Sequence, residues 1–211
     1  MVFEGAKWVN HPVWTFAGEC KPLQLATAAA LGFGVPRTVV ANVLPAEWAT
    51  MSRLAVKALD TFLLRHEGSD LFFYTRALSP AELQGGNIRE MPVIIQEFLA
   101  EKRDVRVTIV GDLCFFARTE TSVDGDWRTQ KDRTKFVPFE GGSDISERCR
   151  ALLKRFRLRY AAIDLVQVRD EFVFLEMNPT GEWGWLDDAF DGRIGLAIAN
   201  ELLMDDHAPL P

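Results

Sequence analysis

Two spacings of hydrophobic residues recur along the chain, one typical of helices and one typical of strands. The helical spacing begins after Lys21-Pro22, where a proline in the first turn removes no helical hydrogen bond, and it stops before Gly32. Ser143 precedes another long helical pattern and is expected to act as its N-cap. The spacing predicts helices over residues 23–31, 45–53, 143–157 and 192–203.

Strands are indicated where apolar residues alternate with polar ones or form short runs between turn residues. The turn Gly111-Asp112 separates two such stretches and predicts a hairpin, and a buried run ends at Gln96-Glu97. Residues 60–86 show a weaker pattern, with a strand and a helix start in FFYTRALSPAEL, while residues 124–135 are predicted to form a polar loop or flap. The other predicted strands are residues 37–42, 54–59, 105–110, 113–119, 161–168 and 172–177. Because helices and strands do not alternate regularly, the predicted fold class is α+β rather than a doubly wound sheet.

The last two predicted strands bring acidic side chains together. If residues 169–171 connect them as a hairpin, Asp164 lies directly opposite Glu176, and Asn178 points to the same face. Carboxylates in opposite positions repel each other, so we expect a cation between them. Two carboxylates and an amide oxygen are ligands that suit Mg²⁺. The residues alone also allow a solvated sheet face, with Asn178 merely starting a turn.

The composition narrows the classes of partner. The chain has 211 residues, 48% of them hydrophobic, which allows one generous domain or two small ones. A net charge of -6 argues against a nucleic-acid partner. The three cysteines show no C-x-x-C spacing, so we expect reduced thiols and a cytoplasmic protein. No export signal and no run of about 18 apolar residues is visible, so no membrane partner is expected.

One lysine, Lys57, lies inside the apolar stretch LAVKAL. A buried ammonium group is costly unless an anion pairs with it, so Lys57 is a candidate anion-binding residue on physical grounds alone. The sequence contains no phosphate-binding loop, dinucleotide-binding fingerprint, zinc-protease motif or nucleophile elbow. Trp183 and Trp185 could stack on a ligand, although packing explains such a pair as well.

Several pieces of sequence, taken in order, resemble the ATP-grasp ligases. They are KPLQLATAAALGFGVPRTVVAN, VKAL, VIIQEFLAEKRDVRVTIVGD, DWR, YAAIDLVQV and FVFLEMNPTGEWGW. The chain looks most like the graspetide (microviridin-type) macrocyclases, which mature ribosomally made peptides. The resemblance implies an ATP-grasp fold in which two α+β subdomains clasp a nucleotide between antiparallel sheets. It divides the chain into an N-terminal segment, a central subdomain and a C-terminal subdomain, at residues 1–20, 21–95 and 96–211.

The resemblance also implies roles for individual residues. Glu101 or Asp104 is expected near the ribose of the nucleotide. The residues matched to phosphate or acyl-phosphate binding are Lys21, Lys57, Arg106 and Arg128. Those matched to the segment that reads adenine through main-chain groups are Gln96, Glu97, Phe98 and Leu99. Those matched to the magnesium ligands are Asp164, Glu176 and Asn178. On the residues alone, lysines and arginines placed like Lys21 and Arg128 are more often solvated, and a strand end followed by a turn explains the adenine segment equally well.

The implied function is an ATP- and Mg²⁺-dependent ligase that joins a carboxylate to an amine or hydroxyl through an acyl phosphate. The expected partners are a peptide or small-molecule carboxylate and a precursor peptide, and a homo-oligomer is left open. Family members typically carry a further N-terminal domain, which is not seen here, and often have Asn-Gly-Gln where this chain has Thr180-Gly181-Glu182. A shortened domain that binds nucleotide or peptide without catalysis is therefore the alternative. A structural domain without a ligand is a third reading.

Overall fold

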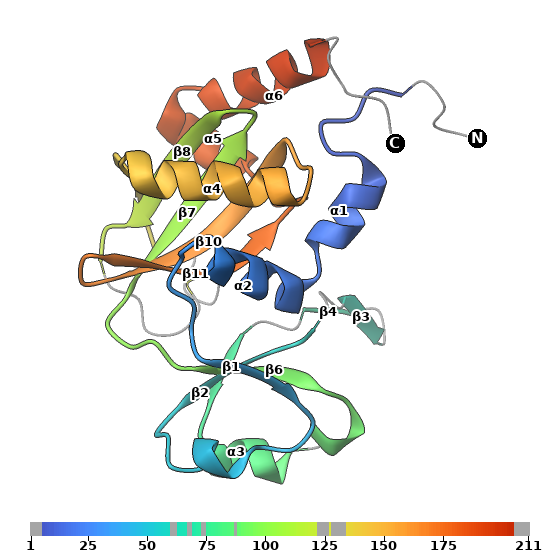
Figure 1. The fold of residues 1–211 in the computed structure, drawn as a ribbon, viewed down its shortest axis with the longest axis vertical. Coiled ribbons are helices and arrows are strands. Elements are labelled where there is room, and N and C mark those ends of the chain that lie inside the picture. Colours follow the sequence, from blue (N-terminus) through green and yellow to red (C-terminus); the bar gives the residue numbers. More distant parts are fainter. Residues whose placement is uncertain are drawn as a thin grey trace.

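The computed structural model describes residues 6–59, 63–66, 69–72, 75–86, 88–121, 127 and 134–204. These residues form two larger antiparallel sheets, a separate β3–β4 hairpin and the helices around them (Figure 1). The helices are α1 (Pro12–Gly18), α2 (Lys21–Ala30), η1 (Ala46–Trp48), α3 (Pro80–Gly85), η2 (Ile88–Glu90), α4 (Ser143–Arg155), α5 (Gly184–Asp187), η4 (Asp188–Phe190) and α6 (Arg193–Leu203). The strands are β1 (Thr38–Ala41), β2 (Leu54–Lys57), β3 (Leu63–His66), β4 (Ser69–Phe72), β5 (Arg76–Leu78), β6 (Val93–Glu97), β7 (Arg103–Val110), β8 (Leu113–Thr119), β9 (Phe136–Pro138), β10 (Tyr160–Val168) and β11 (Glu171–Asn178). None of the described helices is long and apolar enough to cross a membrane.

The larger sheet has five strands in the order β11-β10-β7-β8-β9 and lies in the upper part of Figure 1. One of its faces is covered by α2 and α4, whose Leu25 and Leu152 belong to the same core as the strands. The other face is covered by α5 and α6, which contribute Leu186 and Ile194. Because both faces are covered, β7 is buried from Asp104 to Val110 although its sequence RDVRVTIV contains several polar residues, and β10 is buried from Tyr160 to Val166.

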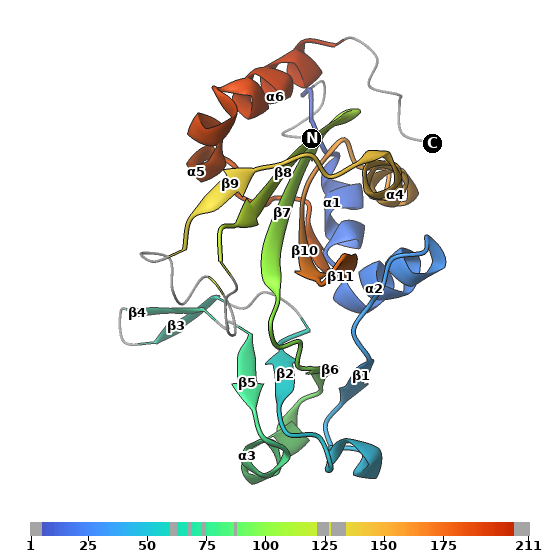
Figure 2. The same ribbon diagram turned by 90° about the vertical axis from the view of Figure 1, so that its left-hand side faces the viewer.

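The smaller sheet has four strands in the order β1-β6-β2-β5 and lies in the lower part of Figure 1. Its core includes the buried residues Trp48, Leu83 and Ile95. The helix α3 beside it begins with a capping box, in which Ser79 and Glu82 each accept a hydrogen bond from the other's backbone N–H. The chain leaves this sheet at the end of β6 and enters the larger one at β7, so residues 98–102 join the two (Figure 2).

The predicted α+β class and most of the predicted elements are confirmed. The helix expected over residues 45–53 is wrong, because only the short 3₁₀ helix η1 forms before the chain turns into β2. The cap predicted at Ser143 is also wrong. Gly142 occupies the N-cap with a φ of 83°, a conformation that glycine adopts without steric strain, and Ser143 is the first helical residue.

The predicted flap and the subdomain boundaries stay predictions. Of residues 124–135, the structure describes Trp127, Thr134 and Lys135, and the rest of the expected flap lies outside the described residues. The helix α2, which was assigned to the central subdomain, packs against the larger sheet. Strand β6 runs across the boundary expected between residues 95 and 96.

The predicted pairing of Asp164 with Glu176 is confirmed, but the connection that was assumed for it is wrong. Val168 pairs with Glu171, so the turn contains Arg169 and Asp170 rather than three residues. The register shifts between Asp164 and Leu165, whose partners are Glu176 and Phe174, so one residue on β11, Leu175, is left over as a bulge. The shorter turn and the bulge cancel, and Asp164 still faces Glu176.

Candidate functional site

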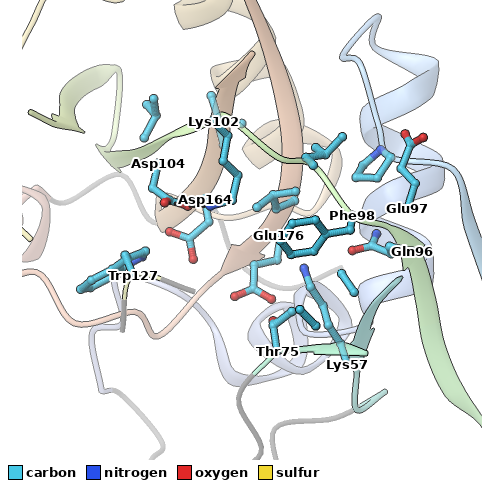
Figure 3. Close-up of a pocket in the computed structure, with 17 residues that line it drawn as sticks. Lys57, Thr75, Gln96, Glu97, Phe98, Lys102, Asp104, Trp127, Asp164 and Glu176 are labelled. Atoms are coloured by element: carbon cyan, nitrogen blue, oxygen red, sulfur yellow. Dashed lines mark hydrogen bonds and ion pairs between the residues drawn. The ribbon is translucent and has the colours of Figure 1, made fainter. Parts of the chain in front are cut away.

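A pocket lies between the two sheets, around the chain segment that joins them (Figure 3). It encloses about 730 Å³, including its open mouth. Its lining comes from the smaller sheet, the larger sheet and the joining segment. The lining residues are Pro36, Ala55, Lys57, Thr75, Ala77, Gln96, Glu97, Phe98, Leu99, Lys102, Asp104, Val105, Trp127, Asp164, Leu165, Leu175 and Glu176.

Lys57 projects from the last position of β2 into this pocket, toward Glu176 (Figure 3). Only 9% of the residue is exposed. Among the residues that the structure describes, its ammonium group forms no hydrogen bond and no ion pair. A nearly buried cation without a carboxylate partner is costly, so its place at the pocket wall indicates a site for an anionic ligand.

The opposed carboxylates of Asp164 and Glu176 also point into the pocket (Figure 3). A cation does lie beside one of them, because Nη1 of Arg106 is 2.6 Å from Oδ1 of Asp164 and both side chains are buried. A second nitrogen of Arg106, Nη2, donates to the carbonyl of Glu182 at 3.3 Å. Its buried Nε has no partner among the described residues. Arg106 therefore lies behind the pocket lining and holds Asp164 in place.

The segment matched to adenine recognition lines the other side of the pocket. The side chains of Gln96 and Glu97 are engaged elsewhere: the Gln96 amide donates to the hydroxyl of Thr38, and the Glu97 carboxylate accepts from the backbone of Arg37. Phe98 is held by the guanidinium of Arg53, whose central carbon lies 4.0 Å from the ring centroid. The main chain of this segment is thereby fixed at the pocket wall.

Lys102 is a pocket residue that the sequence analysis missed. Its ammonium group lies 2.7 and 2.8 Å from the two carboxylate oxygens of Asp104, and both side chains line the pocket. Lys102 and Asp104 are two residues apart where β7 begins, which places both side chains on one face, but the sequence EKRD does not show that this face is buried. Thr75, Trp127 and Leu175 were also missed as lining residues.

Several predicted residues lie outside the pocket lining. Lys21 is at the first turn of α2, and Glu101 is exposed in the joining segment with a φ of 51°. Arg128 falls outside the described residues. Asn178 follows Glu176 on β11, but its Oδ1 accepts hydrogen bonds from the backbone and hydroxyl of Thr180, at 2.9 and 3.1 Å. The roles expected for these four residues stay predictions, as does the phosphate-binding role expected for Arg106, which also lies outside the lining.

The chemistry of the pocket fits a magnesium ion. Asp164 and Glu176 offer hard oxygen ligands from directly opposite positions, and Mg²⁺ usually takes one or two carboxylates and completes its shell with water and substrate phosphates. Among the residues that the structure describes, no group of three or more His, Cys, Asp or Glu could hold a metal without such help. These two carboxylates could hold Mg²⁺ together with ligands from outside the chain.

Comparison with known proteins identifies the fold. The model of the RimK-like ATP-grasp domain matches residues 76–204. The chain belongs to this ATP-grasp family. The resemblance predicted from the sequence, including the ATP-grasp fold, is therefore confirmed. None of the curated protein sequences matches the chain significantly.

Solved ATP-grasp structures resemble the chain over nearly its whole length. A RiPP-associated ATP-grasp ligase from Chryseobacterium gregarium, in complex with ADP and a leader and core peptide, is 27% identical with a TM-score of 0.82 over 97% of this chain and 64% of its own. The macrocyclase MdnC of Microcystis aeruginosa MRC, bound with precursor peptide MdnA, is 28% identical with a TM-score of 0.75 over 92% of this chain and 64% of its own. D-alanine–D-alanine ligase from Bacillus anthracis shares the fold at 12% identity, with a TM-score of 0.65 over 96% of this chain and 73% of its own. The chain thus spans 64% of the length of the two peptide-bound ligases.

Proposed function

We propose that this ATP-grasp chain binds ATP with Mg²⁺ and activates a substrate carboxylate as an acyl phosphate, which an amine or hydroxyl then captures. The observation that carries the proposal is the buried Lys57, which forms no ion pair with the described residues and lies across the pocket from the carboxylates of Asp164 and Glu176. A cation on one side and two acids on the other suit a phosphate chain that carries a metal. The adenine-binding segment supplies the remaining wall.

In the first proposed step, a carboxylate oxygen of the substrate attacks the γ-phosphorus, the bond to the bridging β–γ oxygen breaks, and ADP leaves. In the second step, an amine or hydroxyl attacks the acyl carbon, phosphate leaves with the carbon–oxygen bond electrons, and the nucleophile's proton passes to solvent. Both steps depend on position and charge stabilisation more than on acid–base chemistry. This dependence explains why the pocket needs no nucleophile of its own.

The proposal gives roles to residues that line the pocket and to residues directly behind it. Lys57 donates to phosphate oxygens, and Arg106 holds the Asp164 carboxylate in place through a charge-assisted hydrogen bond. The main chain of residues 96–99 holds the adenine. Asp164 and Glu176, with Asn178 as the expected third ligand, would hold Mg²⁺, which supplies charge neutralisation between the phosphates.

The acceptor is proposed to be a ribosomally made peptide. Support comes from the two peptide-bound ligases, to which the chain is 27% and 28% identical. A cytoplasmic location and a homo-oligomeric state remain expectations. The alternative function, a domain that binds nucleotide or peptide without catalysis, predicts nucleotide binding without phosphate release.

Thermal unfolding with ADP or ATP, each with and without Mg²⁺, tests the nucleotide site. A ligand that binds only the folded state at about 100 times its dissociation constant stabilises it by about 2.7 kcal/mol, so we expect a higher midpoint with nucleotide and a further rise with Mg²⁺. Glu176→Gln should keep the first rise and lose the second. If wild type shows no shift under any condition, the proposed function is wrong; a shift without phosphate release in the presence of precursor peptide would support the non-catalytic alternative.

A further inference from the structure

The position of Glu176 depends on the bulge at Leu175. Phe174 is fully buried in the core, and strict alternation along β11 would turn Glu176 to that same face. Instead, Leu175 and Glu176 both line the pocket, and Met177 returns to the core. Without the bulge, the turn at Arg169-Asp170 would place Glu176 opposite Ile163, a core residue. Something beyond the turn must therefore keep β11 in its shifted register.

Gln24 holds the shifted strand from its outer edge. β11 is an edge strand of the larger sheet, so its outward backbone groups need other partners. The Gln24 side chain, 1% exposed on α2, donates to the carbonyl of Met177 at 2.7 Å and accepts from its N–H at 2.8 Å. Before the bulge, the carbonyl of Gly34 accepts from the N–H of Phe174 at 2.8 Å. The outward N–H groups of Phe174 and Met177 are three residues apart, whereas those of a regular strand are two residues apart. The extra residue is the bulge.

Asn10 holds the end of the strand. Its amide nitrogen donates to the carbonyls of Tyr160 and Pro179, at 2.8 and 3.0 Å. Its amide oxygen accepts from the backbone N–H groups of Arg159 and Tyr160, at 2.9 and 3.0 Å. One half-buried side chain thus joins the start of β10 to the turn that follows β11. All the hydrogen-bonding capacity of the amide is used.

Two further side chains form hydrogen bonds to the turn that follows β11, at Gly181 and Glu182. The hydroxyl of Tyr160 donates to the carbonyl of Gly181, and burial raises the pKa of Tyr160 to about 12, so the donor stays protonated at neutral pH. Arg106 donates to the carbonyl of Glu182 while it also pairs with Asp164. Gly181 lies so close to β10 that an added Cβ would be 2.6 Å from the Cβ of Ala162. The turn is fixed in one position against β10.

From these contacts we infer that Asn10 and Gln24 are positioning residues, which lock β11 in the bulged register and so keep Glu176 in the pocket opposite Asp164. Neither side chain lines the pocket, so both act through the backbone of β11. The part of this inference that concerns magnesium and turnover rests on the proposed function, whereas the part that concerns register does not.

The register is read directly from backbone NOEs between β10 and β11 in the ligand-free protein. Wild type should show contacts between the opposite pairs Asp164–Glu176 and Ala162–Asn178. In Asn10→Ala and Gln24→Met these contacts should weaken or be replaced by those of the unbulged register, while the pair Val168–Glu171 beyond the bulge is kept. Asn10→Asp separates the two halves of the amide, because a carboxylate can still accept from Arg159 and Tyr160 but cannot donate to Pro179. It should therefore behave like Asn10→Ala.

Matched controls separate register from general destabilisation. Asn42→Ala removes an amide, directly after β1, that donates to the carbonyl of Arg89 in η2. Thr27→Val removes a hydroxyl that donates to Leu23 within α2. Both controls should keep the wild-type NOEs. Asn10 is half-buried, so its variants test the inference even if Gln24→Met does not fold.

The functional readout is the Mg²⁺-dependent part of the midpoint shift with nucleotide. The Asn10 and Gln24 variants should keep the shift with nucleotide alone, lose the magnesium increment, and turn over about 100-fold more slowly, as expected for misplaced reacting groups. Unchanged NOEs and an unchanged magnesium increment in all these variants would overturn the inference. An absent nucleotide shift in wild type would instead defeat the proposed function, and the NOEs would still decide the register.

Discussion

Replacement of Lys57 with methionine is expected to raise the unfolding midpoint of the ligand-free protein and to weaken the response of this midpoint to ATP. The lysine is 9% exposed and has no ionic partner among the described residues, so an apolar side chain of similar length should stabilise the fold by roughly 1–3 kcal/mol. The same change removes the proposed donor to the phosphates. We expect nucleotide affinity to fall roughly 10- to 100-fold and turnover roughly 100- to 1,000-fold.

Lys57→Met should thus increase the stability of the ligand-free protein and decrease its stabilisation by ATP. This combination distinguishes a residue that binds ligand from one that only packs in the core. Thermal unfolding of Lys57→Met without ligand measures the first effect, and the same scan with ATP and Mg²⁺ measures the second. Lys154→Met, at an exposed position on α4, is the control and should change neither. A lower midpoint together with an intact ATP response would show that Lys57 supports the strand and does not bind phosphate.

Lys57 could be predicted as an anion-binding candidate from the sequence because the evidence for it lies within a few neighbouring residues. A lysine within an apolar strand pattern conflicts with the pattern itself, and the conflict needs no knowledge of the rest of the fold. The opposed pair Asp164 and Glu176 was also predicted, although the connection assumed for it was wrong. Period-two alternation decides which residues share a face, and this rule holds on either side of a bulge. The bulge itself depends on contacts from Asn10 and Gln24, more than 150 positions away along the chain. No local sequence pattern therefore predicts it.

The pocket as a whole could not be predicted from periodicity, because its wall is assembled from both sheets and the segment between them. Lys102 shows the difficulty. In the sequence EKRD it reads as one of several solvated charges, and only the fold buries it beside Asp104. Glu101, the neighbouring candidate, is exposed instead, because its positive φ turns the chain at this point. The family resemblance narrowed the ribose residue to these two acids, and the structure places Asp104 in the pocket lining.

The Lys102–Asp104 pair leads to the second large expected effect. The two side chains are 9% and 10% exposed, so removal of one partner leaves the other charge buried without this ion pair. Breaking such a pair typically costs about 3–5 kcal/mol, whereas replacing both partners is often close to neutral. Lys102→Met and Asp104→Asn should each lower the free energy of unfolding by about 3 kcal/mol. The double variant should recover most of this loss.

Urea unfolding of the four proteins in this double-mutant cycle measures the coupling between Lys102 and Asp104. Recovery of stability in the double variant should not restore nucleotide binding, because both residues line the pocket and the ligand would lose both polar contacts. Restored stability together with weak ATP binding in the double variant would show that Lys102 and Asp104 contribute to nucleotide binding. If the double variant bound ATP as well as wild type does, the pair would serve the fold alone, and the ribose end of the pocket would have to be sought at other lining residues.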